Sequence, residues 1–359
     1  MEKNQKFLEM HSNTNYNIIS LATPVIDHYY QVRIEELRKE NISYGCTNFV
    51  SRSELLEYKK KFAKNFVFTY PGDNARNTFE TLGRLVKIIE QKKFKANYIG
   101  CVGANQNNLI ELFDQSLRDN GITTTLFRKN GNFGEILCLV DEKGQRTFIA
   151  DLGVSEQFKL DYSYIKEIVD TTSSIYMTSI TLLTKNEISY TAKKIFEYAT
   201  LKNKFFIISL ESPKMLSKNR VKILEILKKS NLVFANEEEI MAVFGKDYLI
   251  ELQHFIQINS LANRLIYIKL GKKGSMVIKN DGKFIKCPAF KVNKIVDTTA
   301  AGDNFIAGVL FGLLFFNDEI NAMKLGNYLG YLTIQNLGPS IRNLEKEISK
   351  DSLMNLFIV

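Results

Sequence analysis

The chain has 359 residues, 45% hydrophobic and 24% charged, a composition typical of globular proteins. No uninterrupted apolar stretch reaches the roughly 18 residues that span a bilayer, and residues 1–20 lack a signal-peptide core, so we expect a cytoplasmic protein without membrane contact. Four singly scattered cysteines argue against a zinc site or a disulfide framework. The net charge of +9 comes from lysines spread along the whole chain, so we expect no nucleic-acid partner.

In chain order, short segments rich in β-branched and aromatic residues alternate with longer segments whose apolar residues recur at helical spacing. The short segments are predicted to be buried strands at 17–22, 96–102, 174–177, 204–209, 232–235, 265–270 and 276–278. Amphipathic or buried helices are predicted at 107–120, 302–316 and 319–336. This alternation is typical of a parallel α/β sheet.

Two stretches break the alternation and are interpreted as insertions on the sheet. Residues 28–70 are charged and rich in tyrosine, and residues 123–149 predict a strand, a turn at 141–144 and a second strand. The predicted organisation is a polar N-terminal tail at 1–16, an α/β domain from 17–27, 71–122 and 150–345, insertions at 28–70 and 123–149, and a C-terminal segment at 346–359.

The most distinctive local pattern is Asp297-Thr298-Thr299-Ala300-Ala301-Gly302-Asp303, which precedes a helix of small and apolar residues. Small residues at the start of a helix expose backbone N–H groups at its positive end, where a phosphate or a developing anion can bind. A carboxylate placed there, such as Asp303, can accept the proton of an attacking hydroxyl group. An aspartate near a helix start can equally be an N-cap, so the residue types alone leave both interpretations open.

This segment resembles the Asp-Thr-x-Gly-Ala-Gly-Asp signature of the ribokinase-like (PfkB) kinases, with Ala300 in place of the first glycine. The resemblance covers about 17–339 and is greatest to adenosine kinases. It implies an α/β fold, a three-layer sandwich with a mostly parallel central sheet, in which the two insertions form a small β-rich lid. It also implies that Asp303 is the general base and that the backbone N–H groups of Ala301, Gly302 and Asp303 form the anion hole for the phosphoryl group.

Two further elements resemble the nucleotide side of the family's site. Asn236 and Glu239, after an apolar strand, match an Asn-x-x-Glu element, which implies that they hold Mg²⁺ through water near the phosphates of ATP. Taken alone, this pair also fits an N-cap followed by acidic first-turn residues. Gly271 and Gly274 resemble the glycine turn that approaches ATP, and Thr298 of the signature is assigned to the same nucleotide site.

The acceptor side of the site also has counterparts in the sequence. The segment ending at Asp27 resembles the Asn-Pro-Leu-Leu-Asp element of adenosine kinases, which implies that this carboxylate holds the ribose hydroxyls. Gly72 and Asn77 match the family's Gly-Gly-x-x-x-Asn element, whereas Asp73 replaces the second glycine. Arg146 matches an arginine on the return strand of the lid and is expected to face the phosphates on closure; a solvent-exposed hairpin arginine is the other interpretation.

The resemblance implies a reaction in which ATP, with Mg²⁺, phosphorylates the 5′-hydroxyl of adenosine to give AMP, a step of purine salvage. A sugar kinase acting on a ribose- or fructose-like alcohol is the first alternative. The second is a non-catalytic, ligand-binding regulator, because Ala300 and Asp73 depart from the family pattern. The expected partner is a small-molecule alcohol, and the expected assembly is a monomer or a homodimer.

Overall fold

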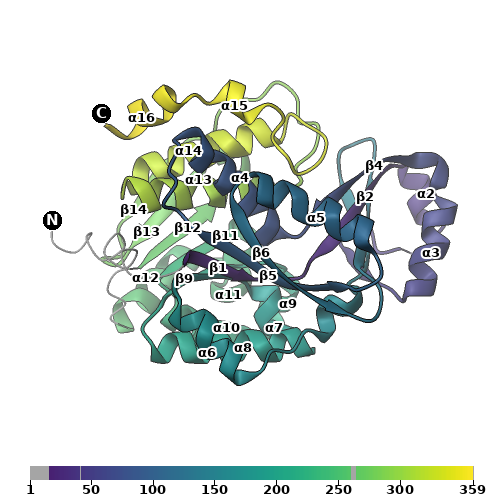
Figure 1. The fold of residues 1–359 in the computed structure, drawn as a ribbon. Coiled ribbons are helices and arrows are strands. Elements are labelled where there is room, and N and C mark those ends of the chain that lie inside the picture. Colours follow the sequence, from purple (N-terminus) through teal and green to yellow (C-terminus); the bar gives the residue numbers. More distant parts are fainter. Residues whose placement is uncertain (1–15, 41, 260–263, 359) are drawn as a thin grey trace.

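The computed structural model describes residues 16–40, 42–259 and 264–358 (Figure 1). Its largest feature is a sheet of nine strands in the order β14-β13-β12-β11-β10-β9-β1-β5-β6. Strands β12 to β6 of this order run parallel, and β13 and β14 continue one edge antiparallel. The strands are β1 (Tyr16–Leu21), β5 (Ala96–Gly103), β6 (Ile122–Lys129), β9 (Thr172–Thr178), β10 (Phe205–Ser209), β11 (Leu232–Asn236), β12 (Leu265–Lys269), β13 (Ser275–Lys279) and β14 (Phe284–Cys287).

All seven strands predicted from the sequence are present, with ends within two residues of the predicted ones. The burial of β10 and β11 explains why they could be recognised, because four of the five residues of each strand are buried. Strands that helices cover on both faces read as nearly continuous apolar runs. The mostly parallel central sheet is thereby confirmed, and the predicted tail at 1–16 lies outside the described residues except for Tyr16.

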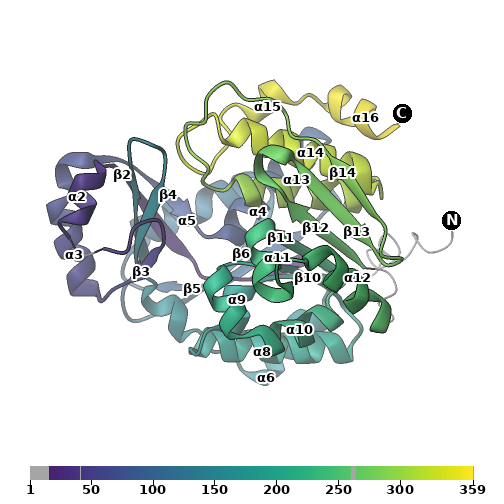
Figure 2. The same cartoon turned by 180° about the vertical axis from the view of Figure 1, so that it is seen from behind.

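Helices cover both faces of the large sheet and complete a three-layer sandwich, which Figures 1 and 2 show from opposite sides. One face carries α4 (Asn74–Ile88), α5 (Asn107–Asp119), α13 (Ala301–Phe315), α14 (Glu319–Thr333), α15 (Leu344–Glu347) and α16 (Lys350–Ile358). The other carries α6 (Tyr162–Asp170), α7 (Ser179–Leu183), α8 (Glu187–Leu201), α9 (Pro213–Lys218), α10 (Arg220–Lys229), α11 (Glu237–Phe244) and α12 (Tyr248–Ile258). Short 3-10 helices lie at Gly153–Gln157 and Gly271–Lys273.

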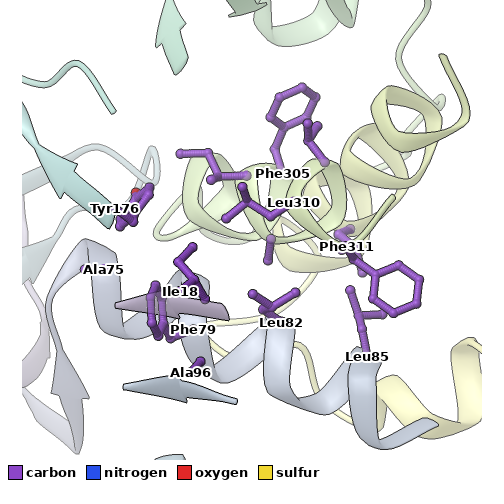
Figure 3. Close-up of a cluster of buried hydrophobic side chains, with 14 of the residues drawn as sticks. Ile18, Ala75, Phe79, Leu82, Leu85, Ala96, Tyr176, Phe305, Leu310 and Phe311 are labelled. Atoms are coloured by element: carbon purple, nitrogen blue, oxygen red, sulfur yellow. The ribbon is translucent and has the colours of Figure 1, made fainter. Parts of the chain in front are cut away.

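The core on the first face positions the site because it joins α4 to α13. Leu82 and Leu85 of α4 face Leu310 and Phe311 of α13 in Figure 3, and all four side chains are fully buried. Removing one such large side chain from a packed core typically costs about 2–5 kcal/mol. The two helices are therefore fixed side by side, and their first turns lie next to each other.

A second, smaller sheet has the order β3-β8-β7-β2-β4 and stands beside the main body (Figure 1). Its strands are β2 (Val25–Gln31), β3 (Thr47–Phe49), β4 (Phe66–Gly72), β7 (Gly134–Val140) and β8 (Arg146–Asp151). The helices α2 (Ile34–Arg38) and α3 (Arg52–Lys61), with a 3-10 turn at Ala63–Asn65, accompany it. Leu37 of α2 and Leu55 of α3 pack in an apolar cluster with Tyr30, Leu137 and Ile149 of the sheet.

The extent of the small sheet differs from the two insertions predicted at 28–70 and 123–149. Strand β6 pairs with β5 along its whole length, so residues 122–129 belong to the large sheet. Strand β2 already begins at Val25, and β4 continues to Gly72. Alternating apolar residues predict a strand equally well in either sheet, and only the long-range pairing decides which sheet receives it.

Glu135 of β7 anchors α3 to the small sheet through a buried ion cluster. Its carboxylate receives the His28 ring Nε2 at 2.6 Å, the Lys59 ammonium at 2.6 Å and the Arg52 guanidinium at 2.5 Å. Burial raises the pKa of this carboxyl, but the hydrogen bonds from His28, Lys59 and Arg52 outweigh it and hold the pKa well below its usual range. The negative charge at Glu135 therefore holds three side chains from β2 and α3 in one place.

No helix in the described ranges is both long and apolar enough to cross a lipid bilayer. The four cysteines are free thiols: Cys101, Cys138 and Cys287 are buried, and Cys46 is exposed.

Candidate active site

The first turns of α4 and α13 meet through side-chain hydrogen bonds. The Asn77 amide donates to the Asp303 carboxylate at 3.0 Å, and the Thr78 hydroxyl donates to the Asp303 carbonyl at 3.2 Å. One turn further along, the Thr81 hydroxyl donates to the Asn304 side-chain oxygen at 2.6 Å. The candidate base, Asp303, is thus held from a helix more than two hundred residues away in sequence.

The Asp303 carboxyl has an environment that suits a proton acceptor at neutral pH. It is 9% exposed, and burial raises its pKa to about 6, while the hydrogen bond from Asn77 and the charges of Lys269 and Arg146 act in the opposite direction. A pKa just below the working pH leaves most molecules ionised while keeping the group basic enough to take a proton. The N-cap interpretation is excluded for this residue, because Asp303 lies inside the helix and Ala300 occupies the cap position.

The loop before α13 is fixed by Asp297, which is fully buried. Its carboxylate accepts from the Thr299 N–H at 2.9 Å, from the Thr299 hydroxyl at 2.7 Å and from the Gly338 N–H at 2.9 Å. Ala300 then adopts φ +57° and ψ +7°, a left-handed conformation that favours glycine. The alanine that replaces the family's first glycine therefore has a backbone conformation suited to glycine.

Two backbone donors at the start of α13 lack acceptors. Among the described residues, the N–H groups of Gly302 and Asp303 meet no hydrogen-bond acceptor, whereas the Ala301 N–H donates to the Thr298 carbonyl at 3.3 Å. The anion hole expected from residues 301–303 thus has two open donors instead of three. Thr298, expected at the nucleotide, has an exposed side chain and contributes its carbonyl to this turn.

Asp27 lies on β2, inside the small sheet, rather than in the α/β domain to which residues 17–27 were predicted to belong. It is 8% exposed, and its Oδ1 is buried with no hydrogen-bond partner among the described residues. Burial raises its pKa to about 7, with the charge of Arg76 opposing. Gly72 is needed beside it, because a Cβ at that position would lie 2.4 Å from the carboxylate. An orphaned buried carboxylate oxygen indicates a place for a ligand hydroxyl.

Asp73, the residue that replaces a family glycine, has φ +109°, which is a rare backbone conformation for a non-glycine residue. Its side chain caps α4 by accepting from the Arg76 N–H at 3.2 Å, and it also accepts from the Tyr98 hydroxyl at 2.8 Å. Burial is the main cause that raises the pKa of Asp73 to about 7; the hydrogen bonds from Tyr98 and Arg76 act to lower it, and the charge of Asp303 contributes to the rise. The substitution therefore adds a titratable group at the start of α4, near Asp303.

Arg146, the first residue of β8, extends from the small sheet to the loop before α13. Its guanidinium donates to the Thr299 hydroxyl at 3.2 Å and lies over the Phe148 ring. Within the described residues it forms no ion pair with a carboxylate. The structure thus places this cation beside the loop before α13 rather than on an exposed hairpin.

Asn236 and Glu239 form a capping box at the start of α11. The Asn236 side chain accepts from the Glu239 N–H at 2.8 Å, and Glu239 Oε2 accepts from the Asn236 N–H at 2.7 Å. Glu239 Oε1 has no protein donor in the described part of the chain, and no cluster of three metal-binding side chains occurs there. One carboxylate oxygen fits water-mediated Mg²⁺ binding, in which the ion keeps most of its waters and contacts phosphates.

The glycine turn after β12 is explained by local packing. Gly271 and Gly274 have φ values of +57° and +96°. A Cβ on Gly274 would lie 2.1 Å from the Cys287 carbonyl oxygen, so this glycine allows the chain after β14 to pass closely over the turn. The nucleotide role expected for the two glycines stays a prediction.

Two charged residues near the site are not among the site residues predicted from the sequence. Lys269 ends β12, and Glu211 follows β10 and accepts a hydrogen bond from the Asn74 amide at 2.5 Å. Burial raises the pKa of Glu211 to about 8, with the Asn74 hydrogen bond opposing. Their sequence positions could have indicated them, because ligands of parallel α/β sheets bind at the carboxyl ends of the strands, where both residues lie.

The sequence profile of the pfkB family carbohydrate kinases matches residues 38–347, so the chain belongs to this family of kinases. The chain is 24% identical over 349 residues to adenosine kinase of Dictyostelium discoideum, covering 93% of this chain and 99% of that protein. It is 29% identical over 247 residues to an uncharacterized sugar kinase of Archaeoglobus fulgidus, covering 67% of this chain and 92% of that protein.

The fold is likewise similar to that of solved kinases. The structure of adenosine kinase from Schistosoma mansoni in complex with 2-fluoroadenosine superimposes with a TM-score of 0.78 at 20% identity, covering 95% of this chain and 99% of that one. The ribokinase-like architecture, with its small second sheet, is therefore confirmed, and the chain is adenosine kinase-like.

Proposed function

We propose that this kinase transfers the γ-phosphoryl group of ATP to the 5′-hydroxyl of adenosine, giving AMP, with Asp303 as the general base. The observation that carries the proposal is the buried Asp303 carboxylate, held by Asn77 directly beside the open N–H groups of α13. A base and an anion-binding helix end within one helical turn are the two groups that phosphoryl transfer to an alcohol needs.

In the proposed reaction, Asp27 orients the acceptor by accepting hydrogen bonds from two ribose hydroxyls. Its orphaned Oδ1 supports this role, because a vicinal diol would satisfy it. Asp303 then takes the proton of the 5′-hydroxyl, and the N–H groups of Gly302 and Asp303 hold the phosphoryl oxygens. Arg146 adds positive charge from the small sheet, which acts as the lid.

Mg²⁺, when bound through water at Asn236 and Glu239, would neutralise charge on the phosphates. The capping box leaves Glu239 Oε1 available for such a water, which supports the assignment. Gly271, Gly274 and Thr298 are proposed to border the nucleotide. We place the reaction in purine salvage in the cytoplasm, consistent with four free thiols, and in a monomer or a homodimer.

A sugar kinase acting on a ribose- or fructose-like alcohol is the second candidate. It is favoured by the similarity to the Archaeoglobus fulgidus sugar kinase and by Asp73, because that carboxylate can accept hydrogen bonds from a polyol. A non-catalytic regulator is the third candidate. The site retains the Asn77–Asp303 hydrogen bond and the orphaned Asp27 oxygen, which a chain without catalysis would have no chemical reason to keep.

The test is Mg²⁺-dependent phosphate transfer from ATP to adenosine, other nucleosides, ribose and fructose phosphates, in the wild type and in Asp303→Asn. The Asn variant keeps the size of the side chain and can still contact Asn77, so it removes the base with little change in packing. Transfer to adenosine that collapses in the variant supports the proposal. Transfer only to a sugar selects the second candidate, and ligand binding without transfer to any acceptor selects the third.

A further inference from the structure

Lys269 is a charged residue at the end of a strand that is otherwise apolar. Strand β12 reads Leu-Ile-Tyr-Ile-Lys, and Ile266, Tyr267 and Ile268 are buried. In the parallel pairing with β11, Lys269 lies opposite Asn236. It is therefore located at the carboxyl edge of the sheet, next to the start of α11 and facing the site.

The Lys269 ammonium lies against the first turn of α13. A Cβ placed on Gly302 would be 3.1 Å from Lys269 Nζ and 3.8 Å from its Cε. Gly302 carries one of the two open N–H groups of that turn. The absence of a side chain at Gly302 therefore allows a positive charge to approach the place where a phosphoryl group would be held.

The ammonium lacks the partner that a half-buried lysine usually has. In the part of the chain that the structure describes, the Lys269 side chain forms no ion pair and no hydrogen bond, whereas the Lys279 side chain on the neighbouring strand pairs with Glu319 at 2.7 Å. Its positive charge acts to lower the pKa of two nearby carboxyls, those of Asp303 and Glu239. Withdrawing a cation from water without a partner costs free energy, which an anionic ligand would recover.

A second unpaired cation lies on the other side of the same loop. Arg146 donates to Thr299 from the small sheet, whereas Lys269 approaches Gly302 from the large sheet. Two cations from different sheets thus converge on one helix N-terminus whose N–H groups are open. The arrangement suits an anion with several negatively charged oxygens, because each oxygen needs hydrogen-bond donors and the two cations add donors to the open N–H groups.

We propose that Lys269 is a further catalytic residue, which contacts the transferring phosphoryl group of ATP at the N-terminus of α13. This inference rests on the proposed phosphotransfer reaction. During transfer, negative charge spreads over the three equatorial oxygens of the phosphoryl group, so a fixed positive charge beside them stabilises the transition state more than the ground state. A lysine suits this position because its ammonium is a compact point charge with three donors.

The test compares Lys269→Met, Lys269→Gln and Lys269→Arg with the wild type. Methionine and glutamine remove the charge and leave an unbranched or amide side chain one atom shorter than lysine, and arginine restores a cation. The matched control is Lys283→Met, since Lys283 lies in the exposed turn between β13 and β14 with its side chain 83% accessible. Steady-state turnover gives kcat and KM, and calorimetric titration gives the affinities for ATP and ADP.

We expect Lys269→Met and Lys269→Gln to lower kcat about 100-fold, as does loss of one donor to a developing negative charge. The preference for ATP over ADP should fall about 10-fold, because only ATP carries the contacted phosphoryl group. Lys269→Arg should recover part of kcat and part of the preference for ATP, and Lys283→Met should have the kcat and the nucleotide affinities of the wild type. A purely structural role would change stability while leaving the ATP to ADP ratio unaltered.

A kcat for Lys269→Gln or Lys269→Met within threefold of the wild type, in a folded protein, would overturn the inference. If the wild type transfers phosphate to no acceptor, the proposed function fails, and the nucleotide titrations still test Lys269. An ATP to ADP affinity ratio that is equal in the wild type and in both neutral variants would then reject the contact. Having two neutral variants keeps the test decisive if one of them does not fold.

Discussion

Replacing Ala300 with glycine should stabilise this protein, although glycine usually destabilises. Ala300 has φ +57°, and an L-residue with a Cβ pays about 1–2 kcal/mol in this left-handed region. Glycine avoids that cost but loses about 0.4–1 kcal/mol through the greater freedom of the unfolded chain. We therefore expect Ala300→Gly to raise the free energy of unfolding by about 1 kcal/mol.

The neighbouring alanine supplies a matched control. Ala301 is the first residue of α13 and has no positive φ, so Ala301→Gly should lower the free energy of unfolding by up to about 1 kcal/mol. The same chemical change at adjacent positions is thus expected to have opposite signs. Urea unfolding followed by circular dichroism suits the measurement, because 1 kcal/mol shifts the midpoint temperature of a chain this long by only roughly 1 °C.

An Ala300→Gly variant that is no more stable than the wild type would refute the reasoning. It would mean that the loop before α13 relaxes, so that residue 300 is not held in the left-handed region. We also expect faster turnover from Ala300→Gly, because removing the methyl group opens the loop that we propose receives the phosphoryl group. Slower turnover together with higher stability would support the left-handed conformation of residue 300 and contradict the expected effect of the methyl group on turnover.

Three further predictions concern single carboxylates. Asp303→Asn should lower kcat/KM about 10²–10⁴-fold. In the wild type, kcat/KM should fall tenfold for each pH unit below about pH 6, because the raised pKa of Asp303 leaves the proposed base protonated there. Asp73→Asn should become more stable relative to the wild type, measured by urea unfolding, as the pH rises from 3.8 to about 7. Over that range Asp73 ionises in the unfolded chain, whereas its raised pKa keeps it protonated in the folded protein, so the wild type loses stability. Glu135→Gln should lower the free energy of unfolding by about 3 kcal/mol and speed proteolysis of residues 42–65, because His28 and Lys59 lose the carboxylate that they share. Unchanged cleavage would argue against the ion cluster around Glu135 as the anchor of α3.

Part of the site could be predicted from the sequence because it is carried by contiguous residues. The segment from Asp297 to Asp303 specifies a turn, a helix start and a carboxylate, and the structure has all three. Asn77 was assigned from its motif, but its hydrogen bond to Asp303 depends on the packing of α4 against α13. Local patterns name candidate residues, whereas contacts between distant segments decide which candidates meet.

Lys269 and Glu211 show why the rest could not be predicted. Lys269 ends an apolar strand and Glu211 follows one, and many charged residues at such positions in the chain are simply solvated. Their proximity to α13 and α4 arises from the order of strands in the sheet, which places β12, β11 and β10 side by side. The strand order is a global property of the fold that no short window of sequence contains.

The sequence by itself determined the kinds of elements and their order, because apolar periodicity sets whether a segment buries one face as a strand or as a helix. It determined the alternation of the large sheet and the small-residue start of α13. Only the tertiary structure decided that β6 joins the large sheet, that Asp27 lies in the small one, and that Ala300 takes a left-handed conformation. These outcomes depend on long-range pairing and packing, whose free energy is gained only when segments far apart in sequence come together.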